Sequence, residues 1–316
     1  MYKHILFLFL FLSMTLLVTA DETLDRYLLD GKRNILQSEH LGIINHHLTI
    51  GTPYRTVGMV EGLWAPPYVS GDFVSILKID GKQVSVSNHL WLPVKVEQEG
   101  TLDNISVKSQ LLLVAGKRVA IQSVTLRNNS ETKKEFTFEM VLSKNTLDWS
   151  DVWEFSTEKS RTMTTVDVQD HTIFLNQGKY AVIAVTDHST WSWDSDSRTG
   201  KCTVTLDPDR NEIFHFVFAI GEKENALTDV REIVSAPEKQ IVRSEKIYSS
   251  EINAMYEKLP RFRSDNKELE RLYDRSLMHF FTNRWNVDEF CLHPYYGTGG
   301  IRGGCVCNYL WNYGEV

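Results

Sequence analysis

The chain has 316 residues, with 34 Lys and Arg against 41 Asp and Glu and a formal net charge of −7. This acidic balance argues against a nucleic-acid partner, because phosphate binding needs a basic face. A hydrophobic fraction of 42% is ample for a packed core, and the length suits one large domain or two smaller ones.

The first twenty residues read as a secretory signal peptide. Lys3 and His4 start it, residues 5–18 form an almost unbroken apolar run, and Val18-Thr19-Ala20 offers a cleavage site before the polar Asp21-Glu22. The run is shorter than the ~20 residues of a spanning helix, which favours cleavage near Ala20 over a membrane anchor. We therefore expect a secreted or periplasmic protein without a membrane span.

From about Ile35 to Ile220 the apolar residues recur with a period of two, which is typical of half-buried antiparallel strands. The predicted strands include Val74–Ile79, Ile105–Val114, Val119–Leu126, Phe136–Leu142, Tyr180–Thr186, Cys202–Leu206 and Ile213–Ile220. The predicted turns between strands are Asp80-Gly81, Glu99-Gly100, Ala115-Gly116, Asn128-Asn129, Gln177-Gly178 and Thr199-Gly200. A dozen or more short strands joined by hairpins predict a large two-sheet sandwich.

After Gly221 the period becomes helical. We predict helices over residues 223–234 and 238–259, separated by the break at Ala236-Pro237. A third helix over 265–285 follows a capping box of Asp265 with Glu268. Its apolar face consists of Leu269, Leu272, Tyr273, Leu277, Phe280 and Phe281, with few neighbours in the sequence to cover it. The sequence therefore predicts the front part of a longer protein.

The four cysteines leave three interpretations open. Export permits a disulfide, for which Cys291 with either Cys305 or Cys307 is the plausible pair. A zinc site with His293 is an alternative, but its spacing matches no common zinc framework. Buried free thiols are the third interpretation. We expect no metal ion and no cofactor, and the oligomeric state is not predicted.

Three segments resemble those of a known enzyme group. They are residues 218–227 at the end of the sandwich, 267–277 in the third helix, and the Gly- and aromatic-rich pair 295–301 and 310–315. With the exported sandwich and helical linker, they resemble the N-terminal portion of the six-hairpin glycosidases, of the trehalase, processing α-glucosidase and debranching-enzyme type.

The resemblance implies a mainly β fold with C-terminal α structure. It comprises a signal peptide at 1–20, an antiparallel β-supersandwich at 21–221, a helical linker at 222–262 and the start of an (α/α)6 barrel at 263–316. The implied activity is hydrolysis of α-glucoside-like bonds in an oligosaccharide or polysaccharide by two carboxylic acids. By the same resemblance, these acids come from later hairpins of the barrel and lie beyond this chain.

The candidate substrate-binding residues lie near the C-terminus: Tyr295, Tyr296, Arg302, Trp311 and Glu315. The aromatic rings suit the C–H faces of sugars, although aromatic residues also fill cores. Arg302 either binds hydroxyls or pairs with Asp288 or Glu289. Glu315 is interpreted equally as a sugar-binding residue beside Trp311 or as a surface acid, and it is a weak candidate for a catalytic acid.

Other motifs receive ordinary interpretations. Residues 297–303 lack the Gly-Lys-Ser/Thr ending of a phosphate loop, and Asp194 with Asp196 lacks the rest of a calcium loop. His46-His47 is interpreted as part of a strand, and residues 64–68 as a structured loop. Asn104 and Asn128 begin glycosylation sequons if the source is eukaryotic. The alternatives to an enzyme fragment are a non-catalytic carbohydrate-binding sandwich and a structural exported protein.

Overall fold

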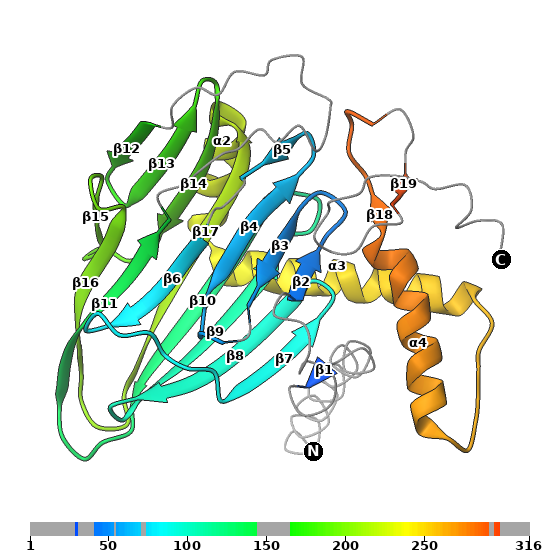
Figure 1. Cartoon of the computed structure of the whole chain (residues 1–316), viewed down its shortest axis with the longest axis horizontal. Coiled ribbons are helices and arrows are strands. Elements are labelled where there is room, and N and C mark those ends of the chain that lie inside the picture. The colour runs from blue at the N-terminus through cyan, green and yellow to red at the C-terminus, as the bar shows by residue number, and fades with distance from the viewer. Residues whose placement is uncertain are drawn as a thin grey trace, which may run out of the picture.

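The computed structural model describes residues 29–30, 41–53, 55–70, 74–143, 165–290 and 294–297. In these residues two large antiparallel sheets pack face to face and three helices follow them in the chain (Figure 1). The predicted sandwich with C-terminal helices is therefore confirmed. The signal segment and most of the C-terminal segment lie outside the described residues.

The strands of the first sheet lie in the order β1 (Leu29–Asp30), β7 (Asn88–Leu92), β8 (Lys95–Leu102), β9 (Ile105–Leu113), β10 (Val119–Asn128), β17 (Asn211–Glu222), β14 (Tyr180–Thr186), β13 (Thr172–Gln177) and β12 (Thr165–Gln169). The second sheet has the order β15 (Ser192–Asp194), β16 (Thr199–Leu206), β11 (Lys134–Leu142), β6 (Val74–Ile79), β4 (Val60–Ala65), β3 (Thr49–Thr52) and β2 (Leu41–Ile44). In addition, β5 (Tyr68–Val69) pairs with β4, and β18 (Arg284–Trp285) pairs with β19 (Tyr295–Tyr296).

The alternating pattern of the strands places one row of side chains between the sheets. At the centre of this core, the rings of Phe138 and Phe214 lie 4.9 Å apart and those of Trp191 and Phe216 lie 5.0 Å apart. The inner residues of β11 alternate with partly exposed ones, as the sequence pattern predicts. Burial of these large rings provides much of the hydrophobic stabilisation of the sandwich.

Two of the predicted turns are wrong, because Gly100 and Gly200 lie inside strands β8 and β16. A Cβ atom on Gly100 would lie 2.2 Å from the backbone oxygen of Ser85, and one on Gly200 would lie 2.3 Å from Nε1 of Trp191. Both glycines allow a close approach of neighbouring groups. The chain turns instead at Asp103-Asn104 and in the loop 195–198, where Asp194 accepts backbone hydrogen bonds.

The helices cover the outer face and one end of the first sheet. Helix α2 (Lys223–Val234) packs Ala226, Val230 and Ile233 onto that sheet, within the predicted bounds. Helix α3 (Pro237–Lys258) is held by the Tyr248 hydroxyl, which donates to the carbonyl of Leu113 at 2.8 Å. The helices of the described chain lack the combination of length and hydropathy needed to cross a bilayer.

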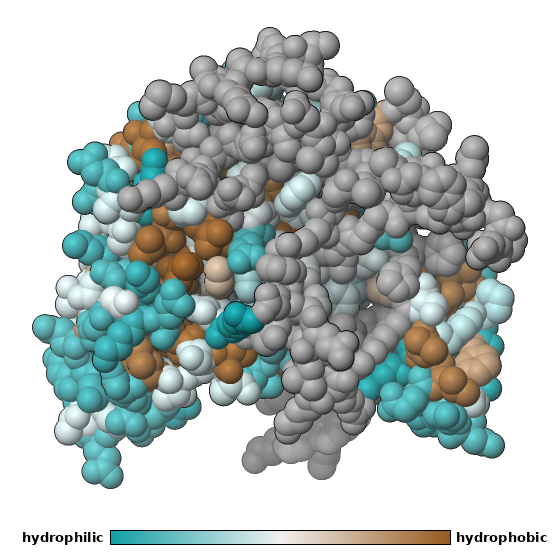
Figure 2. Space-filling view, viewed as in Figure 1, coloured by the Kyte–Doolittle hydropathy of each residue, from teal (hydrophilic) through white to brown (hydrophobic). Residues whose placement is uncertain are grey.

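Helix α4 (Lys267–Thr282) begins at a different cap from the predicted one. Asn266, rather than Asp265, accepts the backbone N–H of Glu268 at 3.0 Å, and Glu270 accepts the N–H of Ser264. One face of the helix packs through Met278 and Phe281 onto α3 and the β7–β8 turn. The other face of α4 leaves Leu269 46% and Leu272 61% exposed, and Phe262, which precedes the helix, is 38% exposed. Figure 2 shows brown surface in the region of α4.

Three further expectations are corrected by the local structure. His46 and His47 lie in a turn between β2 and β3, where His46 has a φ of 72°, and not in a strand. Residues 64–68 are mostly strand. Strand β4 ends at Ala65 and β5 begins at Tyr68, with the cis peptide Pro66-Pro67 between them. Asn128 is fully buried, with its amide donating to the carbonyls of Thr132 and Leu206, so its side chain is not accessible to glycosylation.

Candidate functional site at the junction of the sandwich and the helices

Of the predicted site residues, the structure describes Tyr295 and Tyr296. They form β19 and pair with Trp285 and Arg284 of β18. The ring of Tyr295 contacts that of Phe290 at 5.4 Å, beside the buried Trp285. Tyr296 is exposed. Arg302, Trp311 and Glu315 lie outside the described residues, as do Cys291, His293, Cys305 and Cys307.

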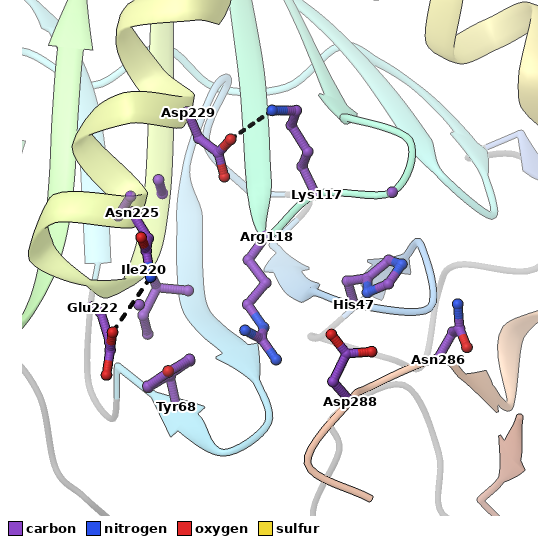
Figure 3. Close-up of a pocket in the computed structure, with 14 residues that line it drawn as sticks. His47, Tyr68, Lys117, Arg118, Ile220, Glu222, Asn225, Asp229, Asn286 and Asp288 are labelled. Atoms are coloured by element: carbon purple, nitrogen blue, oxygen red, sulfur yellow. Dashed lines mark hydrogen bonds and ion pairs between the residues drawn. The ribbon is translucent and has the colours of Figure 1, made fainter. Parts of the chain in front are cut away.

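A cavity of about 340 Å³ lies where the end of the sandwich meets the segment after β18. Its walls come from segments far apart in the sequence: the β2–β3 turn, the β4–β5 hairpin, the β9–β10 turn, the β17–α2 junction and the residues after β18 (Figure 3). The polar side chains that line it are His47, Tyr68, Lys117, Arg118, Glu222, Asn225, Asp229, Asn286 and Asp288. Neither Tyr295 nor Tyr296 lines this cavity.

Arg118 occupies the centre of the cavity wall. Its Nη2 donates to the carbonyl of Pro66 at 2.9 Å and to Oε2 of Glu289 at 2.8 Å. The guanidinium carbon lies 5.0 Å from the centroid of the Tyr68 ring, at a distance typical of a cation–π contact. Burial raises the pKa of Tyr68, although Arg118 opposes this, so the phenol stays neutral. Arg118 thus joins the β4–β5 hairpin to the segment after β18.

Lys117 and Glu222 are each engaged within the protein. Lys117 Nζ lies 2.5 Å from Oδ1 of Asp229 and 3.0 Å from Oε2 of Glu232. Burial by itself would lower the pKa of Lys117, but the hydrogen bonds to these two carboxylates outweigh it and raise the pKa. Glu222 accepts a hydrogen bond from Asn225 at 3.3 Å and lies 3.5 Å from Lys179.

The β2–β3 turn ties the cavity walls together. The Asn45 amide donates to the carbonyls of Val114 and Lys117, at 2.7 and 2.9 Å. On the other side, His46 Nδ1 donates to the carbonyl of Arg284 at 2.9 Å, because a carbonyl oxygen can only accept. The backbone N–H of Asn286 donates to the carbonyl of His46 at 2.9 Å. The turn therefore binds the sandwich to the segment after α4.

His47 and Asp288 lie next to each other on one side of Arg118 in Figure 3. Burial lowers the pKa of His47 to about 4, with a smaller contribution in the same direction from the charge of Arg118 and an opposing one from Asp288. The imidazole is therefore neutral at neutral pH. Asp288 is exposed and has no hydrogen bond or ion pair with another described residue. In the described part of the chain, no group of three His, Cys, Asp or Glu is arranged to hold a metal ion.

Together these groups can bind hydroxyls. Carboxylate, amide and neutral imidazole groups accept or donate hydrogen bonds, and a volume of this size falls in the range of small-molecule sites. The sequence interpretation missed this cavity, although it noted His47 and the loop containing Tyr68. Nothing in the local pattern of Arg118 or Asp288 distinguishes them from other surface charges. They become neighbours only because distant turns meet.

Similarity to known proteins is found among solved structures. No protein-family model and no curated protein matches the chain. A glycosyl hydrolase of family gh92 is similar with a TM-score of 0.43 and 12% identity over 79% of this chain and 39% of that one. A bacterial glucoamylase complexed with acarbose has a TM-score of 0.42 and 8% identity over 78% and 40%. A galactose mutarotase-like protein from Lactobacillus casei has a TM-score of 0.38 and 9% identity over 58% and 100%. The chain thus spans about two fifths of the two hydrolase chains.

Proposed function

We propose that this chain is the N-terminal part of an exported glycoside hydrolase of the six-hairpin type, and that the junction cavity holds part of its glycan. In this proposal, residues 21–221 form the sandwich domain, 222–262 the linker and 263–316 the start of the (α/α)6 barrel. The exposed apolar face of α4 is the surface against which further helices of the barrel pack.

One observation carries the proposal. The cavity is built jointly by the sandwich and by the segment after α4, and hydroxyl-binding groups line both walls. Tyr68 of the β4–β5 hairpin and Asn225 at the start of α2 line one side, whereas Asn286 and Asp288 line the other. Sugar ligands present many hydroxyls, which need such convergent polar partners when they leave water.

The state of the cavity's carboxylates favours binding over chemistry within this chain. Asp229 is held by Lys117, and Glu222 contacts Lys179 and Asn225. Glycoside hydrolysis needs two carboxyl groups that can act on the substrate, and hydrogen bonds already engage Asp229 and Glu222, which leaves Asp288 alone among the cavity's carboxylates. The reacting carboxyl pair is therefore assigned to the later barrel hairpins, and the chain described is expected to bind glycans without hydrolysing them.

A binding experiment tests the proposal. Titration of the chain with α-glucosides such as maltose, followed by NMR shifts or calorimetry, should show saturable binding and no product. Asn286→Ala removes one hydrogen-bonding group and should weaken binding about two- to tenfold. Asn253→Ala, at an exposed position of α3 outside the cavity, is the matched control and should bind as the unaltered chain does.

The outcomes separate the competing functions. A gene product extended by further helical hairpins should hydrolyse the glycan, whereas a non-catalytic module would bind and remain inactive. Absence of binding to every sugar would contradict the proposal. Export is tested separately, because the mature protein should begin at Asp21 by N-terminal sequencing.

A further inference from the structure

The charged side chains around the cavity differ in whether they already have partners within the protein. Both of its cations have carboxylate partners within the protein: Lys117 contacts Asp229 and Glu232, and Arg118 contacts Glu289. Their charges are therefore largely neutralised before any ligand arrives. A negatively charged ligand would have to compete with these carboxylates for the same donors.

The acidic side of the cavity includes a carboxylate that has no ion-pair partner among the described residues. Asp288 lines the cavity, is exposed, and forms no ion pair with another described residue. Its neighbour His47 supplies no compensating charge near neutral pH, because burial lowers the pKa of that imidazole to about 4. Asp288 is consequently the carboxylate that the wall formed after β18 presents to a ligand.

The N-terminus of helix α2 does not make the cavity a binding site for anions. Helix N-termini attract anions through their unpaired N–H groups and dipole. Here Glu222 lies at the N-cap and Glu224 in the first turn, so carboxylates of the chain already occupy this region. Figure 3 shows Glu222 and Asp288 on opposite sides of Arg118, so acidic groups flank the guanidinium in the cavity wall.

We infer that the cavity favours amino sugars over neutral sugars and neutral sugars over acidic ones, with Asp288 as the residue that sets this order. The inference rests on the proposed function, since it concerns the same cavity. Hydroxyls of the ring bind the amide groups of the walls, and an ammonium group of the ligand pairs with the Asp288 carboxylate. A uronate or sugar phosphate in the same position places like charges together.

The test compares three sugars of similar size by NMR titration: glucosamine, glucose and glucuronate. At about pH 6 the amine is protonated, glucuronate is ionised and His47 is neutral. Each change of ligand charge is expected to alter the dissociation constant about two- to fivefold, as for exposed ion pairs. Raising the salt concentration to about 0.5 M should reduce the differences between the three dissociation constants.

Asp288→Asn is the informative variant, and Asp196→Asn in the exposed β15–β16 loop is its control. The first should bring the ratio of the dissociation constants for glucose and glucosamine close to one, and the second should leave the order of the three sugars unchanged. Equal binding of all three sugars, or an order unaffected by Asp288→Asn, would overturn this inference alone. If none of the three bound, the proposed function would fail with it.

Discussion

His89 makes the stability of the sandwich depend on pH in a direction set by its hydrogen bonds. The side chain is 3% exposed in β7. Gln98 Nε2 donates to the carbonyl of Pro53 at 2.7 Å, and Gln98 Oε1 accepts the N–H of Gly58 at 2.8 Å. The amide orientation is thereby determined, so its nitrogen faces His89 Nδ1 at 3.3 Å and Nδ1 must accept.

Protonation of His89 would destroy this arrangement. A proton on Nδ1 would face the N–H of Gln98, and the charge would be buried without a carboxylate partner. Burial accordingly lowers the pKa of His89 to about 4 from 6.5. Above about pH 6.5 the imidazole is neutral in both folded and unfolded chains and contributes no pH dependence. Below that pH the unfolded chain binds a proton that the folded chain excludes, so stability falls as the pH approaches 4.

The separation between 6.5 and about 4 corresponds to a loss of about 3 kcal/mol in the free energy of unfolding. Urea denaturation followed by tryptophan fluorescence, at intervals between about pH 4 and pH 7.5, measures this loss. His89→Gln cannot titrate in this range. The difference in the free energy of unfolding between the variant and the unaltered chain at about pH 7.5 measures the packing lost in the variant. The change in that difference on acidification measures the contribution of His89 protonation.

Equal pH dependence for the two chains would refute the reasoning. A second measurement does not depend on the variant folding well. The NMR titration of ring-labelled histidines in the unaltered chain should assign His89 an imidazole that remains neutral down to about pH 5. An imidazole that became charged near pH 6.5 while the chain stayed folded would contradict the hydrogen-bond argument directly.

Two further predictions concern a close backbone contact and a buried hydrogen bond. Gly100→Ala should lower the free energy of unfolding by about 1–3 kcal/mol, since its Cβ would lie 2.2 Å from the Ser85 oxygen, and an unchanged urea midpoint would contradict this. Tyr248→Phe should cost about 1–2 kcal/mol by leaving the buried Leu113 carbonyl without its donor. Tyr273→Phe, whose hydroxyl bonds an exposed carbonyl, should have a smaller effect in the same denaturation assay, and equal losses would argue against the role of burial.

Local sequence determined much of the secondary structure. The period of two located β6 and β14 at their observed bounds, and the change to helical spacing located α2. These elements follow from local rules, because side-chain alternation and helical repeats depend on near neighbours. The same rules misplaced the turns at Gly100 and Gly200, because a glycine that permits a turn also permits a close contact across a sheet.

The tertiary structure alone decided the candidate site. His47, Arg118 and Asp288 come from turns that are distant in the sequence, and no periodicity links them. Their meeting depends on strand order and on the hydrogen bonds through which the β2–β3 turn joins the sandwich to the segment after α4. The burial that keeps His47 neutral arises from the same packing. The sequence by itself thus determined the types of elements, whereas the long-range contacts decided which polar groups share a cavity and which charges remain available to a ligand.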